Sequence, residues 1–144
     1  MKRATGHPRA ARAASRGLIA LALLGVPAAA APASAGDWVV RDGDGRRIET
    51  IEPGAGDRLV RRDRAGRRTG TVEPAIPGSS PGTGRLIVRD RAGRRQSVVE
   101  PGLGETLVVR DPAGRRLYRI EPGVGDRLIL RGRSGRRAGT IEPR

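Results

Sequence analysis

The chain has 144 residues and a formal net charge of +14, from 29 Lys and Arg against 15 Asp and Glu. It contains no Cys, so no disulfide can brace the fold. One Trp, one Tyr and no Phe leave almost no aromatic surface for stacking on nucleotide bases.

The first 35 residues have the three-part pattern of a secretory signal peptide. Residues 1–16 carry Lys2 and four arginines without an acidic residue, and residues 17–26 are an uninterrupted apolar run. Ala33 and Ala35 supply the small side chains that precede a cleavage site after Ala35. Because Pro27 ends the apolar run well short of the ~20 residues that span a bilayer, we expect a cleaved signal helix. The mature protein, residues 36–144, is then periplasmic or secreted and has no transmembrane segment.

The expected mature chain is rich in arginine and poor in aliphatic side chains. It holds 24 Arg and all 15 acidic residues, a net charge of +9, and contains no Lys, His or Cys. Leu, Ile and Val number 24 of its 109 residues, which is close to the composition of disordered chains. A mostly disordered chain is therefore one alternative. If the chain folds, we expect its stability to come from repeated local pairing more than from one deep core.

Two short motifs recur along residues 36–144 with the same spacing. Gly-Arg-Arg begins at residues 45, 66, 93, 114 and 135, and Glu-Pro begins at residues 52, 73, 100, 121 and 142. Both series step by 21, 27, 21 and 21 residues. Such a period predicts a repeat protein with five units, 36–56, 57–84, 85–104, 105–125 and 126–144. The long step contains an inserted Pro/Gly/Ser-rich loop, residues 75–84, which we expect to act as a hinge.

Each unit has the pattern of a β-hairpin. A β-rich run such as RLIVRD at residues 85–90 leads into Asp-x-x-Gly, which is typical of a type I turn followed by a glycine bulge. A second strand follows and ends at Glu-Pro, because proline has no N–H for the ladder. In the last unit Gly132 replaces the Asp, so we expect a looser turn there.

This turn type predicts a register for each hairpin. In the third unit it places Leu86 opposite Val98, so that Leu86, Val88 and Val98 share one face while Ile87 and Val99 share the other. Both faces are then weakly apolar, which predicts a sheet that coils onto itself. We expect an all-β, twisted antiparallel meander of ten strands, with a partly closed barrel or a β-solenoid as the alternative.

The Asp-x-x-Gly-Arg turn at a period near twenty resembles the tyrosine–aspartate (Rhs-type) β-hairpin repeats of bacterial surface and toxin-shell proteins. The matching residues are Asp42, Gly45 and Arg46; Asp63, Gly66 and Arg67; Asp90, Gly93 and Arg94; and Asp111, Gly114 and Arg115. Arginine stands where that family has its tyrosine, at Arg41, Arg62, Arg89 and Arg110. The resemblance implies a hairpin-repeat fold and supplies no function.

The residue types of the mature chain argue against catalysis. Schiff-base chemistry, nucleophilic triads and His or Cys metal sites all need side chains that residues 36–144 lack. The glutamates of the Glu-Pro motifs recur at equivalent positions, so we expect them to pair with arginines on neighbouring strands instead of serving as acids or bases. Gly-x-Gly-Asp at residues 54–57 and 123–126 lacks the nine-residue period of calcium-binding solenoids. We expect no enzyme activity, no cofactor, no metal and no small-molecule substrate.

The arginine pairs are the one feature that predicts binding. One pair lies just after each turn, at Arg46 and Arg47, Arg67 and Arg68, Arg94 and Arg95, Arg115 and Arg116, and Arg136 and Arg137. On an open meander these tips would form a cationic ridge that suits lipopolysaccharide, an acidic glycan or nucleic acid. Arginines also keep exposed strand edges soluble. We therefore expect an exported, non-enzymatic protein with a structural or protein-contact role at the cell envelope, with polyanion binding as the alternative.

Overall fold

The computed structural model describes residues 37–77 and 84–144. The expected signal helix and cleavage site, and most of the inserted loop, lie outside these residues. The described residues form ten antiparallel strands and no helix. The strands are β1 (Trp38–Asp42), β2 (Arg47–Pro53), β3 (Leu59–Asp63), β4 (Arg68–Pro74), β5 (Leu86–Asp90), β6 (Arg95–Pro101), β7 (Leu107–Arg110), β8 (Arg116–Pro122), β9 (Leu128–Arg131) and β10 (Arg137–Pro143).

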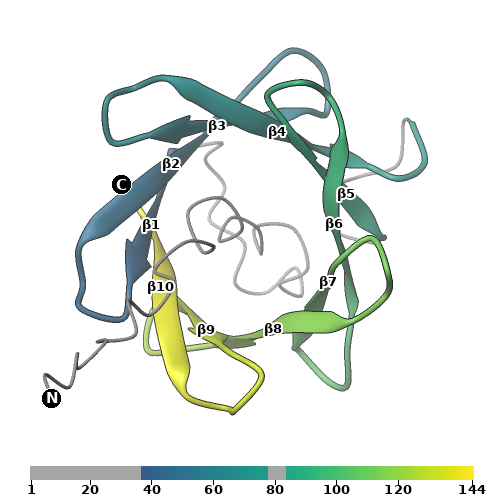
Figure 1. Cartoon of the computed structure of the whole chain (residues 1–144). Coiled ribbons are helices and arrows are strands. Elements are labelled where there is room, and N and C mark those ends of the chain that lie inside the picture. The colour runs from purple at the N-terminus through teal and green to yellow at the C-terminus, as the bar shows by residue number, and fades with distance from the viewer. Residues whose placement is uncertain (1–36, 78–83) are drawn as a thin grey trace, which may run out of the picture.

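The strands follow one another in sequence order around a closed barrel (Figure 1). The prediction of an all-β meander of five hairpins is confirmed, and the sheet closes completely, beyond the partly closed barrel that was the alternative. Closure comes from antiparallel pairing of β1 with β10, in which Val40 lies opposite Ile141. Just beyond these strands the Arg144 N–H donates to the Asp37 carbonyl at 2.9 Å.

The turns inside the hairpins are those predicted from Asp-x-x-Gly. In the third repeat the Gly93 N–H donates to the Asp90 carbonyl at 3.0 Å, and the Asp90 N–H donates to the Arg94 carbonyl at 2.9 Å. Gly93 has φ 80°, the left-handed region that glycine adopts without steric cost. In the last repeat Gly132 makes the same two backbone hydrogen bonds, at 2.9 and 3.0 Å. The backbone of that turn is therefore not looser; only the aspartate cap is missing.

The predicted register is wrong by one residue beyond the turn. Arg89 lies opposite Arg95 as expected, but Val88 lies opposite Ser97, so Gln96 is an extra residue in β6. The same bulge occurs in every hairpin, and the extra residues are Ile48, Thr69, Gln96, Leu117 and Ala138. A bulge bends the strand and increases its twist, which helps a ten-stranded sheet to close. Its consequence is that Val99, and not Val98, shares the inner face with Leu86 and Val88.

The barrel wall is continuous across the inserted loop. Strands β4 and β5 pair from Gly70 opposite Asp90 to Pro74 opposite Leu86, and the Ala75 N–H donates to the Arg85 carbonyl at 2.9 Å. The two ends of the loop are thus held together by the sheet. The prediction of a hinge between the second and third repeats is wrong.

The core fills the barrel with a single set of inward side chains. Its buried members are Val40, Ile51, Val72, Leu86, Val88, Val99, Val109, Ile120, Leu128, Leu130 and Ile141. Trp38, Leu59, Leu107 and Tyr118 pack against them from partly buried positions. A closed barrel has one interior, so a chain with few aliphatic residues can still form a hydrophobic core.

Candidate functional site

All five hairpin tips lie at one end of the barrel, because the chain runs up and down without a crossover. The turns between repeats lie at the opposite end. The ten arginines of the five Gly-Arg-Arg motifs are all exposed at the tips, and we call these ten residues the arginine ring. Sequence reasoning predicted a ridge along one edge. Closure of the barrel arranges the same residues around the barrel axis.

Almost the whole net charge of the described chain lies at this end. The five tips, residues 42–47, 63–68, 90–95, 111–116 and 132–137, hold thirteen Arg and five Asp, a net charge of +8. The other described residues hold eleven Arg and ten acidic side chains, a net charge of +1. The tip charge is uneven: the first tip is neutral because it contains Asp42 and Asp44, and the fifth carries +3. The barrel is therefore strongly polarised along its axis.

The arginines fall into two groups according to their partners. Each of the eleven arginines outside the tips forms an ion pair with a carboxylate. None of the thirteen arginines in the tips forms an ion pair with a described residue. Four of the five tip aspartates, all except Asp44, accept hydrogen bonds from the turn backbone, as where the Arg94 N–H donates to Asp90 Oδ1 at 2.8 Å. The few polar contacts of tip guanidiniums go to carbonyl oxygens, such as Arg133 Nε to the Arg116 carbonyl at 2.8 Å.

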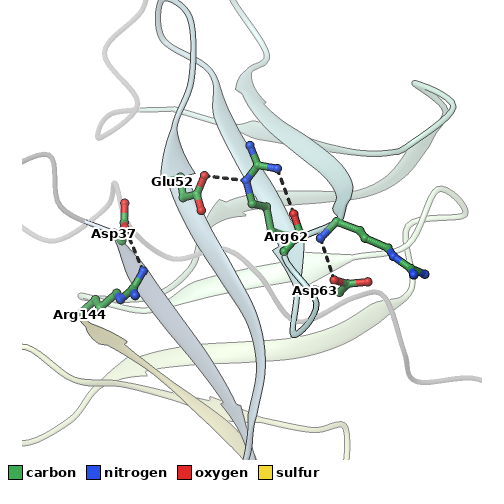
Figure 2. Close-up of polar contacts among 7 residues, drawn as sticks. Asp37, Glu52, Arg62, Asp63 and Arg144 are labelled. Atoms are coloured by element: carbon green, nitrogen blue, oxygen red, sulfur yellow. Dashed lines mark hydrogen bonds and ion pairs between the residues drawn. The ribbon is translucent and has the colours of Figure 1, made fainter.

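A belt of paired arginines and glutamates runs around the outside of the wall below the ring. Arg62 Nε donates to Glu52 Oε2 at 2.7 Å, and Arg62 Nη1 donates to the carbonyl of Gly66 in its own turn at 3.1 Å (Figure 2). Each such pair joins one repeat to its neighbour around the barrel. The other four pairs are Arg41 with Glu142, Arg89 with Glu73, Arg110 with Glu100, and Arg131 with Glu121.

The belt confirms the predicted cross-strand pairing of the Glu-Pro glutamates. Hydrogen bonding to Arg110 lowers the pKa of Glu100, and hydrogen bonding to Arg41 lowers that of Glu142. Both shifts favour the carboxylate form, which suits ion pairing and not proton transfer at neutral pH. The pair between Arg41 and Glu142 also joins the last repeat to the first across the closing seam.

A charged pair inside the barrel was missed by sequence reasoning. Arg61 is fully buried; its Nε donates to Glu49 Oε1 at 3.0 Å and its Nη2 donates to Glu49 Oε2 at 3.2 Å. Gln96 Oε1 accepts from Arg61 Nη1 at 3.1 Å, and Thr69 Oγ1 donates to Glu49 Oε1 at 2.6 Å. Burial raises the pKa of Glu49 although Arg61 opposes the shift.

The sequence does contain a signal for this pair. At the inward position that Arg61 occupies, the other four repeats have Val40, Val88, Val109 and Leu130. Gly70 lies directly opposite Arg61. An arginine at a valine position is thus recognisable once the inner face is known, and two weakly apolar faces left that choice open.

The opposite end of the barrel has a different chemistry. Leu103 and Val124 are 93% and 94% exposed, and Ile76 is 71% exposed. They occupy equivalent positions, three residues after the glutamate of Glu-Pro, where the first repeat has Ala55. This end therefore presents isolated apolar side chains on loops.

Comparison with protein-family models, with curated proteins and with solved structures finds no match. Within residues 37–77 and 84–144, no three acidic, His or Cys side chains are grouped to hold a metal ion. No helix in the described part of the chain is long and apolar enough to span a bilayer.

Proposed function

We propose that this protein is exported and binds polyanions through the arginine ring. The observation that carries the proposal is the division of the arginines: those outside the tips are ion-paired, and those in the tips pair with no carboxylate of the described residues. If the arginines served only solubility, those without a carboxylate partner would be spread over the barrel and not gathered at one end.

The chemistry of the ring suits phosphate, sulfate and carboxylate groups. A guanidinium presents several N–H donors in a planar fork that matches such anions and stays charged at any physiological pH. The tips are short type I turns held by the sheet, so little backbone freedom is lost on binding. Trp38 and Tyr118, the only aromatic residues, face the interior. We therefore propose recognition of backbone charge, as in lipopolysaccharide, acidic glycans or nucleic acid, without reading of bases.

The test is the salt dependence of binding to a duplex DNA or heparin probe. Changing Arg94, Arg95, Arg115 and Arg116 together to Gln should weaken binding. On duplex DNA the change should reduce the slope of log affinity against log salt by up to about 3.6, because each neutralised phosphate contributes about 0.9. The side chains are exposed, so the fold should be retained.

A matched control removes the same charge elsewhere. Arg58, Arg85, Arg119 and Arg127 are more than half exposed, and each glutamate that they contact keeps a second arginine from the belt. Changing these four to Gln should leave the slope close to that of the unmodified protein. Equal losses from both sets of substitutions would show that net charge alone drives binding and that the ring is not a site.

Export is tested separately on the producing cell. Mass spectrometry of the protein recovered from the periplasm or medium should find an N-terminus at Gly36. A chain that begins at Met1 or Lys2 in the cytoplasmic fraction would refute export and leave the ring proposal unchanged.

A structural or protein-contact role at the cell envelope is the second candidate, favoured by the exposed Leu103 and Val124. Changing both residues to Ser should then abolish recovery of a partner protein with the barrel while the fold is retained. If recovery is unchanged, these loop tips are not a contact surface.

A further inference from the structure

The arginine ring is a closed circle around the barrel axis at one end of the barrel, and this geometry selects among polyanions. We infer that the ring docks end-on onto a planar anionic surface, a lipid leaflet with acidic head groups, with the barrel axis along the membrane normal. The inference rests on the proposed function of the ring and specifies its partner.

The dimensions of the barrel favour a plane over a line. Ten strands about 4.8 Å apart and tilted by roughly 40° give a barrel about 20 Å across, with the five tips about 12 Å apart around a circle. An extended linear polyanion that crosses this circle meets two tips at a time. A flat array of anions meets all five tips at once, and only then does every arginine pair gain a partner.

The charge distribution orients the molecule. The tip end carries +8 and the rest of the described chain +1, so an anionic surface attracts one end of the barrel far more than its side. Loops at the other end carry Asp57, Glu105 and Asp126 together with Arg58, Arg85 and Arg127, so their charges cancel and they give an anionic leaflet no net attraction. The exposed Leu103 and Val124 lie on these loops, so they point away from the membrane when the arginine ring faces it.

The tips have the composition of a peripheral contact. Besides arginine they contain only Asp, Gly, Ala, Pro and Ser, so no large apolar side chain can enter the acyl region. Binding is then electrostatic, reversible and sensitive to salt, with each arginine near the surface contributing a similar increment.

The experiment measures binding of the protein, as recovered from the producing cell, to sedimented vesicles. Mixed phosphatidylcholine–phosphatidylglycerol vesicles should bind the protein, and pure phosphatidylcholine vesicles should not. Changing one tip pair to Gln, either Arg67 with Arg68 or Arg136 with Arg137, should lower the affinity for the mixed vesicles by about 30-fold. The two variants should lose similar amounts, because a plane contacts every tip.

A short heparin fragment serves as the linear comparison. The same single-tip variants should lose less than about twofold in heparin affinity, since three of the five adjacent tip pairs remain intact in each. Binding to heparin without binding to the mixed vesicles would overturn the end-on inference while the proposed function survives. A single-tip variant that keeps its vesicle affinity would also overturn it. Binding to neither heparin nor the mixed vesicles would refute both the proposed function and the end-on inference.

The orientation has its own control at the opposite end. Leu103→Ser and Val124→Ser should leave vesicle affinity unchanged, because these residues point away from the surface. If these substitutions reduce vesicle affinity, the apolar end is the docking face and the inference is wrong.

Discussion

Removing the charge of Glu49 should destabilise the barrel more than any exposed substitution. Glu49→Gln keeps the shape of the side chain but withdraws the negative charge from Arg61, which is fully buried. Loss of one partner from a buried ion pair costs about 3–5 kcal/mol. The amide oxygen can still accept one of the two hydrogen bonds that Arg61 donates to Glu49. We therefore expect a loss near the lower limit of that range, about 3 kcal/mol.

The assay is urea unfolding followed by the fluorescence of Trp38, the only tryptophan in the chain. Trp38 packs against the core, so its emission should report loss of the barrel. With a slope of about 2 kcal/mol per molar urea, the midpoint should fall by about 1.5 M. The matched control is Glu52→Gln, which removes a partly exposed belt carboxylate from Arg62. It should cost no more than about 1 kcal/mol.

Two results would contradict this reasoning. If the urea midpoint of Glu49→Gln lies within a few tenths of a molar of that of the unmodified protein, the charge of Glu49 does not stabilise the fold through Arg61. Equal losses from Glu49→Gln and Glu52→Gln would show that burial does not distinguish the two pairs. As a further check, the combined change of Glu49 to Leu and Arg61 to Met should recover much of the loss, because it leaves no unmatched charge.

Three further predictions concern the turns, the inner wall and pH. Gly93→Val should cost about 1–2 kcal/mol in the same urea assay, because a β-branched residue resists φ 80°. Gly70→Ala should also destabilise, by about 1–3 kcal/mol, since the new Cβ would lie 2.0 Å from a carbonyl oxygen of β5. On acidification, the pKa values of Glu100 and Glu142 are lowered by hydrogen bonds to arginine, so their stabilisation is present above pH 4.5 and lost as pH falls through their folded pKa values. Urea midpoints measured from neutral to acidic pH should therefore fall as the pH drops below 4.5.

The local features of the protein could be predicted from the sequence alone. The spacing of Gly-Arg-Arg and Glu-Pro gives five repeats, and Asp90 followed by Gly93 gives the turn that the backbone hydrogen bonds show. Glutamates recurring at one position indicate pairing with arginines, and the belt contains those pairs. These features depend on residues within one or two strands, where steric limits and hydrogen bonding act over short distances.

The β-bulge decides which residues of the second strand in each hairpin face the interior, and the sequence does not mark this bulge. Val98 and Val99 are both apolar, so either register buries one valine, and the extra residue Gln96 carries no glycine or proline signal. The bulge is favoured by curvature of the whole wall, which no single hairpin experiences. Without the correct face, the burial of Arg61 against Glu49 could not be inferred.

The sequence left an open meander and a partly closed barrel as alternatives, and the tertiary structure decided for full closure. Arg41 and Glu142 are 101 residues apart, and the same pairing chemistry would serve equally well in an open sheet that ended in two free edges. Bulged, twisted strands bring β1 beside β10, and pairing them satisfies two sheet edges that would otherwise be exposed. The sequence thus determined that five arginine pairs lie at hairpin tips, and closure of the barrel arranged them as a ring around one end.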